Sequence, residues 1–168
     1  AVPLVEDDIV GRFGLTTEEL ALCCASHNSE PKHIETARSI LEKASLQEED
    51  LECGAHLPFH AESANLLVRS GEEPMPIHNN CSGKHAGMRA LAKAHGWTTR
   101  GYISRDHPVQ ERMIAEVVRW TGIAEADIGL AQDGCGVVCF ATPASRLAYG
   151  FARLGGAEGP PREIVRAM

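Results

Sequence analysis

The chain contains one stretch in which several reactive side chains directly precede an apolar helical pattern: Ile77-His78-Asn79-Asn80-Cys81-Ser82-Gly83-Lys84-His85-Ala86-Gly87-Met88. A thiol, a hydroxyl, an amine and an imidazole occur between positions 81 and 85. Apolar residues continue at helical spacing through Leu91 and Ala92, and Gly96 is typical of a position just past a helix end. The stretch therefore predicts a helix over residues 82–95. Its first turn is expected to carry a functional site, because such polar groups are poorly suited to a core.

The sequence on either side of this helix predicts a mixed α/β or α+β architecture. Apolar periodicity, with proline and glycine at the ends, predicts further helices over residues 3–10, 31–44, 61–69, 108–120, 143–154 and from 161 onward. Two strands are predicted around a glycine-rich turn, over residues 127–131 and 137–140. Residues 20–26 form a short, continuous apolar run, which we interpret as a buried strand.

Length and composition are those of one globular domain spanning residues 1–168, with 43% hydrophobic and 23% charged residues. Sixteen basic and twenty-three acidic residues give a net charge of −7, which argues against partners such as nucleic acid or an anionic membrane. No apolar run is long enough to span a membrane. The six cysteines lack the spacing of a small secreted domain, so we expect free or metal-bound thiols and a cytoplasmic location.

Cys81 lies at the predicted N-terminus of the 82–95 helix, where unpaired backbone N–H groups and a partial positive charge favour a thiolate. Lys84 follows three residues later, so its amine can reach back over the same turn. A thiolate in this setting is suited to act as a nucleophile or as a ligand of a soft metal ion. A buried cysteine that merely begins a helix is the structural alternative. The neighbouring Lys84 and His85 favour a functional role.

A second thiol lies in the motif Asp133-Gly134-Cys135-Gly136, where the glycines permit a tight turn and Asp133 adds a carboxylate. We interpret the two motifs as halves of one polar site, in which Cys81 and Cys135 could hold Zn²⁺ because zinc prefers thiolate sulfur. A hairpin turn with an incidental cysteine is the alternative. The spacing by itself does not bring positions 81 and 135 together.

Ser26-His27 ends the apolar run, and ligands often bind at this end of strands in α/β folds. From spacing alone, a loop serine and a surface histidine are the simpler interpretation. The nearby segment Ser29-Glu30-Pro31-Lys32 formally fits an S-x-x-K pattern, in which lysine can act as a base toward serine. We interpret this match as accidental, because Pro31 and the polar flanks indicate a solvated helix start.

Three motifs together resemble the asparaginase II family, the rhizobial-type L-asparaginases, over essentially the whole chain: Cys23-Cys24-Ala25-Ser26-His27, Asn79-Asn80-Cys81-Ser82-Gly83-Lys84-His85-Ala86-Gly87-Met88 and Asp133-Gly134-Cys135-Gly136. The resemblance implies an amidohydrolase whose substrate is L-asparagine, which it converts to L-aspartate and ammonia. It also implies a fold similar to that of serine β-lactamases and penicillin-binding proteins, and a homodimer.

The same resemblance assigns roles to individual residues. It implies a zinc ion held by Cys81, Lys84 and Cys135, with Lys84 bound as a neutral amine. It implies a catalytic role for Ser26. It further implies that the remaining polar residues of the motifs bind substrate, namely Ser82, His85 and Asp133.

Two parts of the family's site fall outside the 168 residues. Family members carry an S-x-x-K motif before the matched region and, after it, a lysine that partners the serine found here as Ser26. We therefore expect an incomplete part of a longer asparaginase-like domain, with little activity by itself, because a serine without an adjacent base is a weak nucleophile. Two alternatives stay open: a non-catalytic zinc-binding remnant, and a thiol enzyme in which Lys84 and His85 activate Cys81.

Overall fold

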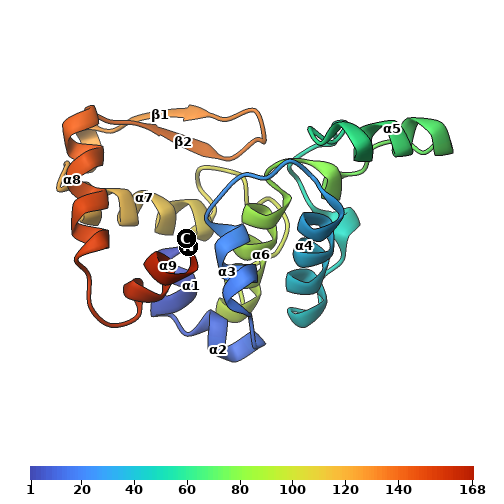
Figure 1. The fold of residues 1–168 in the computed structure, drawn as a ribbon. Coiled ribbons are helices and arrows are strands. Elements are labelled where there is room, and N and C mark those ends of the chain that lie inside the picture. Colours follow the sequence, from blue (N-terminus) through green and yellow to red (C-terminus); the bar gives the residue numbers. More distant parts are fainter.

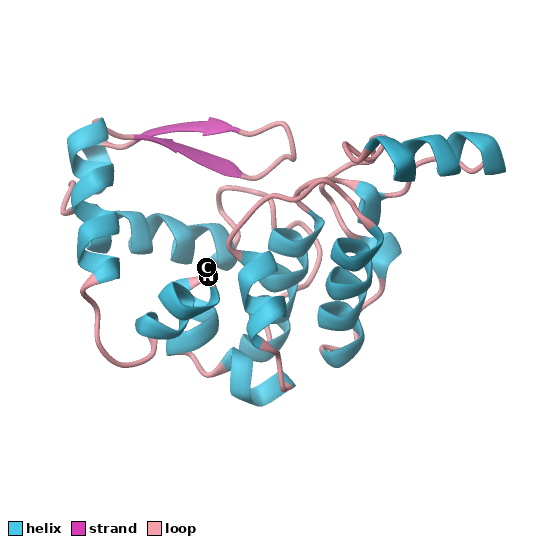
Figure 2. Ribbon diagram, viewed as in Figure 1, coloured by secondary structure: helices cyan, strands magenta, loops and turns pink.

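Helices make up most of the structure, and its one sheet has two strands (Figure 1, Figure 2). A computed structural model describes residues 1–168. The α-helices are α1 Val2–Glu6, α2 Ile9–Phe13, α3 Thr17–Cys23, α4 Pro31–Lys43, α5 Ala61–Ser70, α6 Ser82–His95, α7 Pro108–Thr121, α8 Ala144–Gly155 and α9 Pro161–Ala167. The strands are β1 Gly129–Gln132 and β2 Val138–Ala141, and the single-turn 3-10 helices are η1 Glu48–Asp50, η2 Pro76–His78 and η3 Glu125–Asp127. The predicted mixed architecture is confirmed, with helix as its dominant component.

The predicted helix over residues 82–95 is confirmed and is the centre of the molecule. This helix, α6, packs against α3 and α4 and, over smaller areas, against α1, α2 and α7 (Figure 1). Every residue of its first three turns, Ser82 to Ala92, is buried except Lys84. The core that surrounds it is one continuous cluster of 26 buried hydrophobic residues.

Two glycines of α6 allow α3 to lie directly against it. A Cβ atom at Gly83 would lie 2.5 Å from Cγ of Leu22, and one at Gly87 would lie 2.8 Å from Sγ of Cys23. Both separations are shorter than nonbonded carbon and sulfur atoms tolerate, so a larger residue would force the helices apart. The glycines of the motif thus have a packing role, which brings the C-terminal end of α3 to the first turn of α6.

The predicted strand over residues 20–26 is wrong, because Thr17–Cys23 form the helix α3. Its start is fixed by a capping box, in which the N–H of Glu19 donates to Oγ1 of Thr16 and the N–H of Thr16 donates to Oε2 of Glu19. The helix packs against α4, α6 and α9. It therefore lacks the broad polar face that identifies a surface helix, and its short apolar run is typical of a buried strand as well.

The remaining predicted elements agree with the structure, with bounds that shift by no more than two residues, except at the N-terminus. There, the helix expected over residues 3–10 is divided into α1 and α2 by Asp8, which has a φ of 54°. The two strands pair antiparallel, with Gln132 opposite Val138. They lie along α7, while α5 extends away from the other helices (Figure 1). None of the helices combines the length and apolar character needed to cross a membrane.

Candidate metal and active site

The turn of the β hairpin brings Cys135 to the first turn of α6. Sγ of Cys81, a carboxylate oxygen of Asp133 and Sγ of Cys135 all lie within 4.8 Å of one another. Nζ of Lys84 lies 3.5 Å from Sγ of Cys135 and 3.8 Å from Oδ2 of Asp133. Two motifs that are about 50 residues apart in the sequence therefore form one polar cluster.

Cys81 occupies the N-cap position of α6, and its side chain makes no capping hydrogen bond. The side chain of Asn79, two positions earlier, makes the hydrogen bonds that hold this turn. Oδ1 of Asn79 accepts from the N–H of Cys81 at 2.8 Å, and Nδ2 of Asn79 donates to the carbonyl of Cys53 at 2.9 Å. The thiol of Cys81 is consequently left available for the cluster.

A tight turn orients the second motif. The N–H of Gly136 donates to the carbonyl of Asp133 at 2.9 Å, and the N–H of Asp133 donates to the carbonyl of Val137 at 2.8 Å. Gly136 has a φ of 89°, which side chains other than hydrogen rarely allow. The carboxylate of Asp133 accepts from the N–H of Gly134 at 2.9 Å and from the thiol of Cys135 at 3.3 Å. These bonds fix the carboxylate and the thiol on one side of the turn.

The charges of the cluster follow from burial and from these contacts. Burial raises the pKa of the Cys135 thiol, and the contact with Cys135 lowers the pKa of the Asp133 carboxyl. Burial acts to lower the pKa of Lys84, but the nearby Cys81, Cys135 and Asp133 outweigh it and raise that pKa. At neutral pH, Lys84 is therefore an ammonium and Cys135 a thiol. A metal ion would have to displace a proton from each of them.

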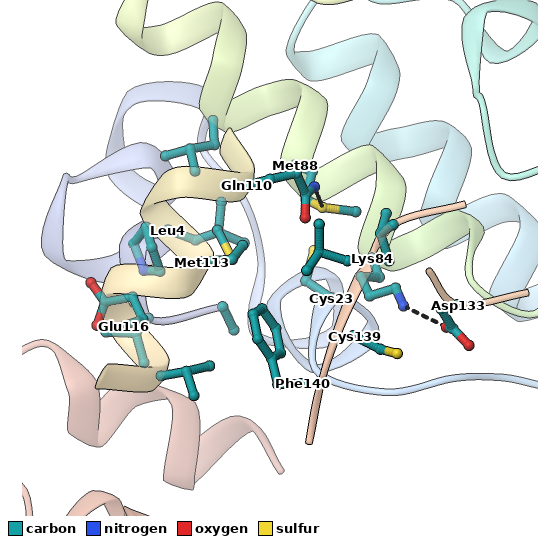
Figure 3. Close-up of a pocket in the computed structure, with 18 residues that line it drawn as sticks. Leu4, Cys23, Lys84, Met88, Gln110, Met113, Glu116, Asp133, Cys139 and Phe140 are labelled. Carbon is teal, nitrogen blue, oxygen red and sulfur yellow. Dashed lines mark hydrogen bonds and ion pairs between the residues drawn. The ribbon is translucent and has the colours of Figure 1, made fainter. Parts of the chain in front are cut away.

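A cavity of about 390 Å³ adjoins the cluster, between α1, α6, α7 and the hairpin. Figure 3 shows Lys84 and Asp133 on its wall, while Leu4, Met113 and Phe140 contribute apolar surface. Its volume is in the range of small-molecule sites, which are mostly apolar with a few polar groups that orient the ligand. The cluster and the cavity together have the form of a ligand-binding site.

Ser26 lies in the exposed loop that follows α3, and no side chain is hydrogen-bonded to its hydroxyl. His27, which we expected at the surface, is instead only 6% exposed. Its backbone N–H donates to the carbonyl of Asn80 at 3.0 Å, which holds the loop against the segment that leads into α6. Ser26 thus directly precedes a residue that contacts the segment before Cys81, and the structure supplies no base at its hydroxyl.

Ser82 is fully buried, and its Oγ lies 3.0 Å from Nε2 of His27. The distance would allow His27 to act as a general base toward the hydroxyl of Ser82. That role requires an unprotonated Nε2, however, and His27 has the other tautomer. The N–H of Ser29 donates to Nδ1 of His27 at 3.2 Å, so the ring carries its proton on Nε2 and donates to Ser82. Burial lowers the pKa of His27 to about 4, which keeps the ring neutral. His27 therefore orients Ser82 and does not activate it.

His85 is also fully buried, and its Nδ1 is hydrogen-bonded to the hydroxyl of Tyr102 at 2.8 Å. Burial lowers its pKa to about 3, so the imidazole is neutral. No hydrogen bond joins Lys84 or His85 to Cys81, and the sulfur that Lys84 contacts is Cys135. The arrangement that the thiol-enzyme alternative requires is not present in this structure.

Other polar residues of the sequence have local structural roles. Oγ of Ser29 donates to the carbonyl of His78 at 2.6 Å, and Lys32 is exposed, so the S-x-x-K pattern is accidental as predicted. Nδ1 of His60 accepts a backbone N–H at the start of α5, and Nδ1 of His107 does so at the start of α7. These histidines serve as helix caps.

The sequence did not single out Tyr102, which is fully buried in the loop between α6 and α7. Its hydroxyl lies 2.8 Å from Nδ1 of His85 and accepts from the N–H of Glu52 at 2.8 Å. A lone tyrosine in a loop has no spacing pattern that would mark it. Only the three-dimensional contact reveals that it belongs beside the site.

The fold and the site define a mainly helical α+β protein whose polar centre combines two thiols, an amine and a carboxylate beside a cavity. The family model of L-asparaginase II matches residues 1–168, and the chain belongs to this family. A search of curated proteins found no match. Membership of the family points to amide hydrolysis, with asparagine as the implied substrate.

Proposed function

We propose that this chain forms part of an amidohydrolase that converts L-asparagine to L-aspartate and ammonia. The observation that carries the proposal is the convergence of Cys81, Lys84, Asp133 and Cys135 on one point beside a small-molecule cavity, in a member of the L-asparaginase II family. The exposed carboxylate of Asp133 is suited to the ammonium group of an amino acid.

We propose further that Cys81, Lys84 and Cys135 hold a zinc ion. Zinc–sulfur bonds of about 2.3 Å in tetrahedral geometry place two thiolates roughly 3.8 Å apart. The sulfurs of Cys81 and Cys135 lie within 4.8 Å, so small side-chain adjustments suffice to reach that geometry. Two thiols and an amine form a donor set that suits zinc. When bound, zinc would supply a positive charge that orients the polar end of the substrate.

Ser26 is the catalytic residue in this proposal. Activated by a base, its hydroxyl would attack the side-chain amide carbon of L-asparagine. The carbon–nitrogen bond then breaks, ammonia leaves with the transferred proton, and water hydrolyses the resulting ester. Asp133 and His85 would bind the substrate. Ser82 would support these residues without contacting the substrate, because its hydroxyl is already hydrogen-bonded to Nε2 of His27.

Several finer features of the proposal rest on the family resemblance. They are the architecture of serine β-lactamases and penicillin-binding proteins and a homodimer. The proposed cytoplasmic location rests on the cysteines instead, because six free thiols, two of them in the cluster, are in keeping with a reducing compartment.

A zinc-binding chain without turnover is the second candidate function. One observation favours it: the hydroxyl of Ser26 has no base as a partner among the 168 residues. Removal of a base from a comparable catalytic group costs several orders of magnitude in rate. We therefore expect zinc and ligand binding by this chain, together with very slow ammonia release.

The test combines binding and turnover in the zinc-loaded chain. Calorimetry should show binding of L-asparagine that is weakened at least tenfold in Asp133→Asn, because a charged contact is lost. An Asp127→Asn variant, altered at an exposed carboxylate outside the cluster, serves as the control. Ammonia release should be close to background and should disappear in Ser26→Ala. Absence of L-asparagine binding, or brisk turnover that survives Ser26→Ala, would contradict the proposal.

A further inference from the structure

One buried nitrogen beside the candidate site has no hydrogen-bond partner in the protein: Nε2 of His85. The residue is 0% exposed and follows Lys84 directly in α6. A buried polar group without a hydrogen-bond partner costs about 1–3 kcal/mol, so native proteins rarely keep one without a reason.

The hydrogen bonds of Tyr102 decide which nitrogen of His85 carries the proton. The phenol oxygen already accepts from the N–H of Glu52, and its only other hydrogen-bond partner is Nδ1 of His85. If the phenol donates to Nδ1, the ring is the Nε2–H tautomer and one group, that N–H, lacks a partner. If Nδ1 were the donor instead, both the phenol proton and Nε2 would lack partners. The first arrangement leaves fewer unsatisfied groups and is therefore favoured.

The position of the phenol is itself fixed. Tyr102 is fully buried, and its carbonyl accepts from Nε2 of Gln110 at 2.9 Å. The ring of Tyr102 meets the imidazole of His85 edge to face, at 5.5 Å and 75°. The phenol can therefore act as a rigid donor to Nδ1 of His85, and this bond leaves the proton of the imidazole on Nε2.

We propose that Tyr102 is a positioning residue, which holds His85 as the Nε2–H tautomer so that this N–H binds an oxygen of the amino-acid ligand. The ligand role rests on the proposed function, whereas the tautomer does not. Because Nε2 is shielded from water, a hydrogen bond formed there is not weakened by solvent competition. Ligand binding must displace the atoms that now cover Nε2. The ¹⁵N chemical shift of Nε2 must therefore change when the ligand binds.

Long-range ¹H–¹⁵N correlation spectra of ¹⁵N-histidine-labelled protein test the tautomer directly. In ligand-free wild type at neutral pH, His85 should show a protonated Nε2 and an unprotonated Nδ1. In Tyr102→Phe, it should show a mixture of both neutral tautomers. Tyr149→Phe, which removes a half-exposed hydroxyl on α8, should leave the His85 signals unchanged. An Nδ1–H ring in the wild type, or an unchanged ring in Tyr102→Phe, would overturn the positioning role.

A ligand titration tests the donor role, with L-aspartate as the probe and the zinc-loaded chain as the protein. Saturation should shift the Nε2 signal of His85, and Tyr102→Phe should bind L-aspartate roughly 3- to 10-fold more weakly. In a His85→Gln background, whose amide donates without help from the phenol, Tyr102→Phe should cause no further loss. An equal loss in both backgrounds would show that the tyrosine is merely structural.

The two proposals fail in different ways. If His85 has the expected tautomer but neither L-asparagine nor L-aspartate binds, the proposed function and the donor role are both contradicted, and the role of Tyr102 in setting the ring stands. If L-asparagine binds and L-aspartate does not, the donor role alone is contradicted. If L-aspartate binds without any shift at Nε2, the donor role alone is contradicted.

Discussion

At the scale of single residues, the site depends on groups that hold protons until a metal displaces them. Lys84 and Cys135 both have a raised pKa in the metal-free protein, for different reasons. The amine is stabilised as an ammonium by the thiols and by Asp133, whereas the thiol is kept neutral by burial. The contacts that hold the cluster together therefore also keep Lys84 and Cys135 protonated, which disfavours metal binding at low pH.

Zinc affinity is consequently predicted to rise with pH. Below the raised pKa values, protons compete for Lys84 and Cys135, so zinc binding must release them. We expect affinity, measured against a chromophoric chelator, to increase by at least about tenfold per pH unit between roughly pH 6 and pH 8. Calorimetry in buffers of different ionisation enthalpy should detect the released protons.

The variant Cys135→Ser should bind zinc weakly, while Cys139→Ser, altered at a cavity-lining thiol outside the cluster, should behave as the wild type. An affinity independent of pH would contradict this account.

The chemistry of the residues was predictable from the sequence, but their hydrogen bonds were not. Cys81 and Lys84 stand out because reactive groups are concentrated around a helix start. The bond between His27 and Ser82 joins positions that no spacing pattern relates. The same is true of Tyr102, which contacts His85 across a loop. Contacts of this kind depend on how α3 and the 96–107 loop fold back on α6.

At the scale of elements, the helices with a marked start, stop and polar face were predictable, and α3 was not. Helix α7 begins with a proline at Pro108 and ends before Gly122, and both signals are local. Helix α3 is apolar because three other helices, α4, α6 and α9, pack against it. The local sequence does not show that these tertiary contacts exist. The capping box at Thr16 and Glu19 was the one local signal that indicated a helix.

The contact between α3 and α6 yields a stability prediction. Gly83→Ala introduces a methyl group 2.5 Å from the side chain of Leu22, and we expect a loss of about 1–3 kcal/mol in the free energy of unfolding. Gly155→Ala in α8 meets no atom within 4 Å and should be neutral or slightly stabilising. Urea unfolding monitored by circular dichroism measures both. Equal stability of Gly83→Ala and the wild type would show that the helices are not in close contact there.

At the scale of the whole molecule, one buried carboxylate joins the helices that support the site. Glu19 of α3 is 3% exposed, and its carboxylate accepts from Ser39 at 2.6 Å and from Lys43 at 2.7 Å, both on α4. Burial acts to raise its pKa, but the bonds to Lys43, Ser39 and Thr16 outweigh it and lower that pKa. Glu19 therefore stabilises the fold more when it is ionised than when it is protonated.

Acid is predicted to weaken the fold through Glu19. Because its folded pKa lies below its unfolded pKa, its contribution is complete above the unfolded value and is lost as the pH falls through the folded value. Glu19→Gln should cost about 1–3 kcal/mol at neutral pH and should flatten the pH dependence of the melting temperature in acid. Glu35→Gln, altered at an exposed position of α4, should leave that dependence unchanged. A Glu19→Gln protein with the acid sensitivity of the wild type would refute this role.

The central claim is that the α6 turn and the hairpin turn form one metal centre. X-ray absorption at the zinc edge of the zinc-loaded chain tests it most directly. The account predicts two sulfur ligands at about 2.3 Å together with nitrogen or oxygen ligands at about 2.0–2.1 Å. Sulfur scattering should fall by half in Cys135→Ser and should persist in Lys84→Ala. A zinc shell of nitrogen and oxygen alone, or a sulfur shell unaffected by Cys135→Ser, would contradict it.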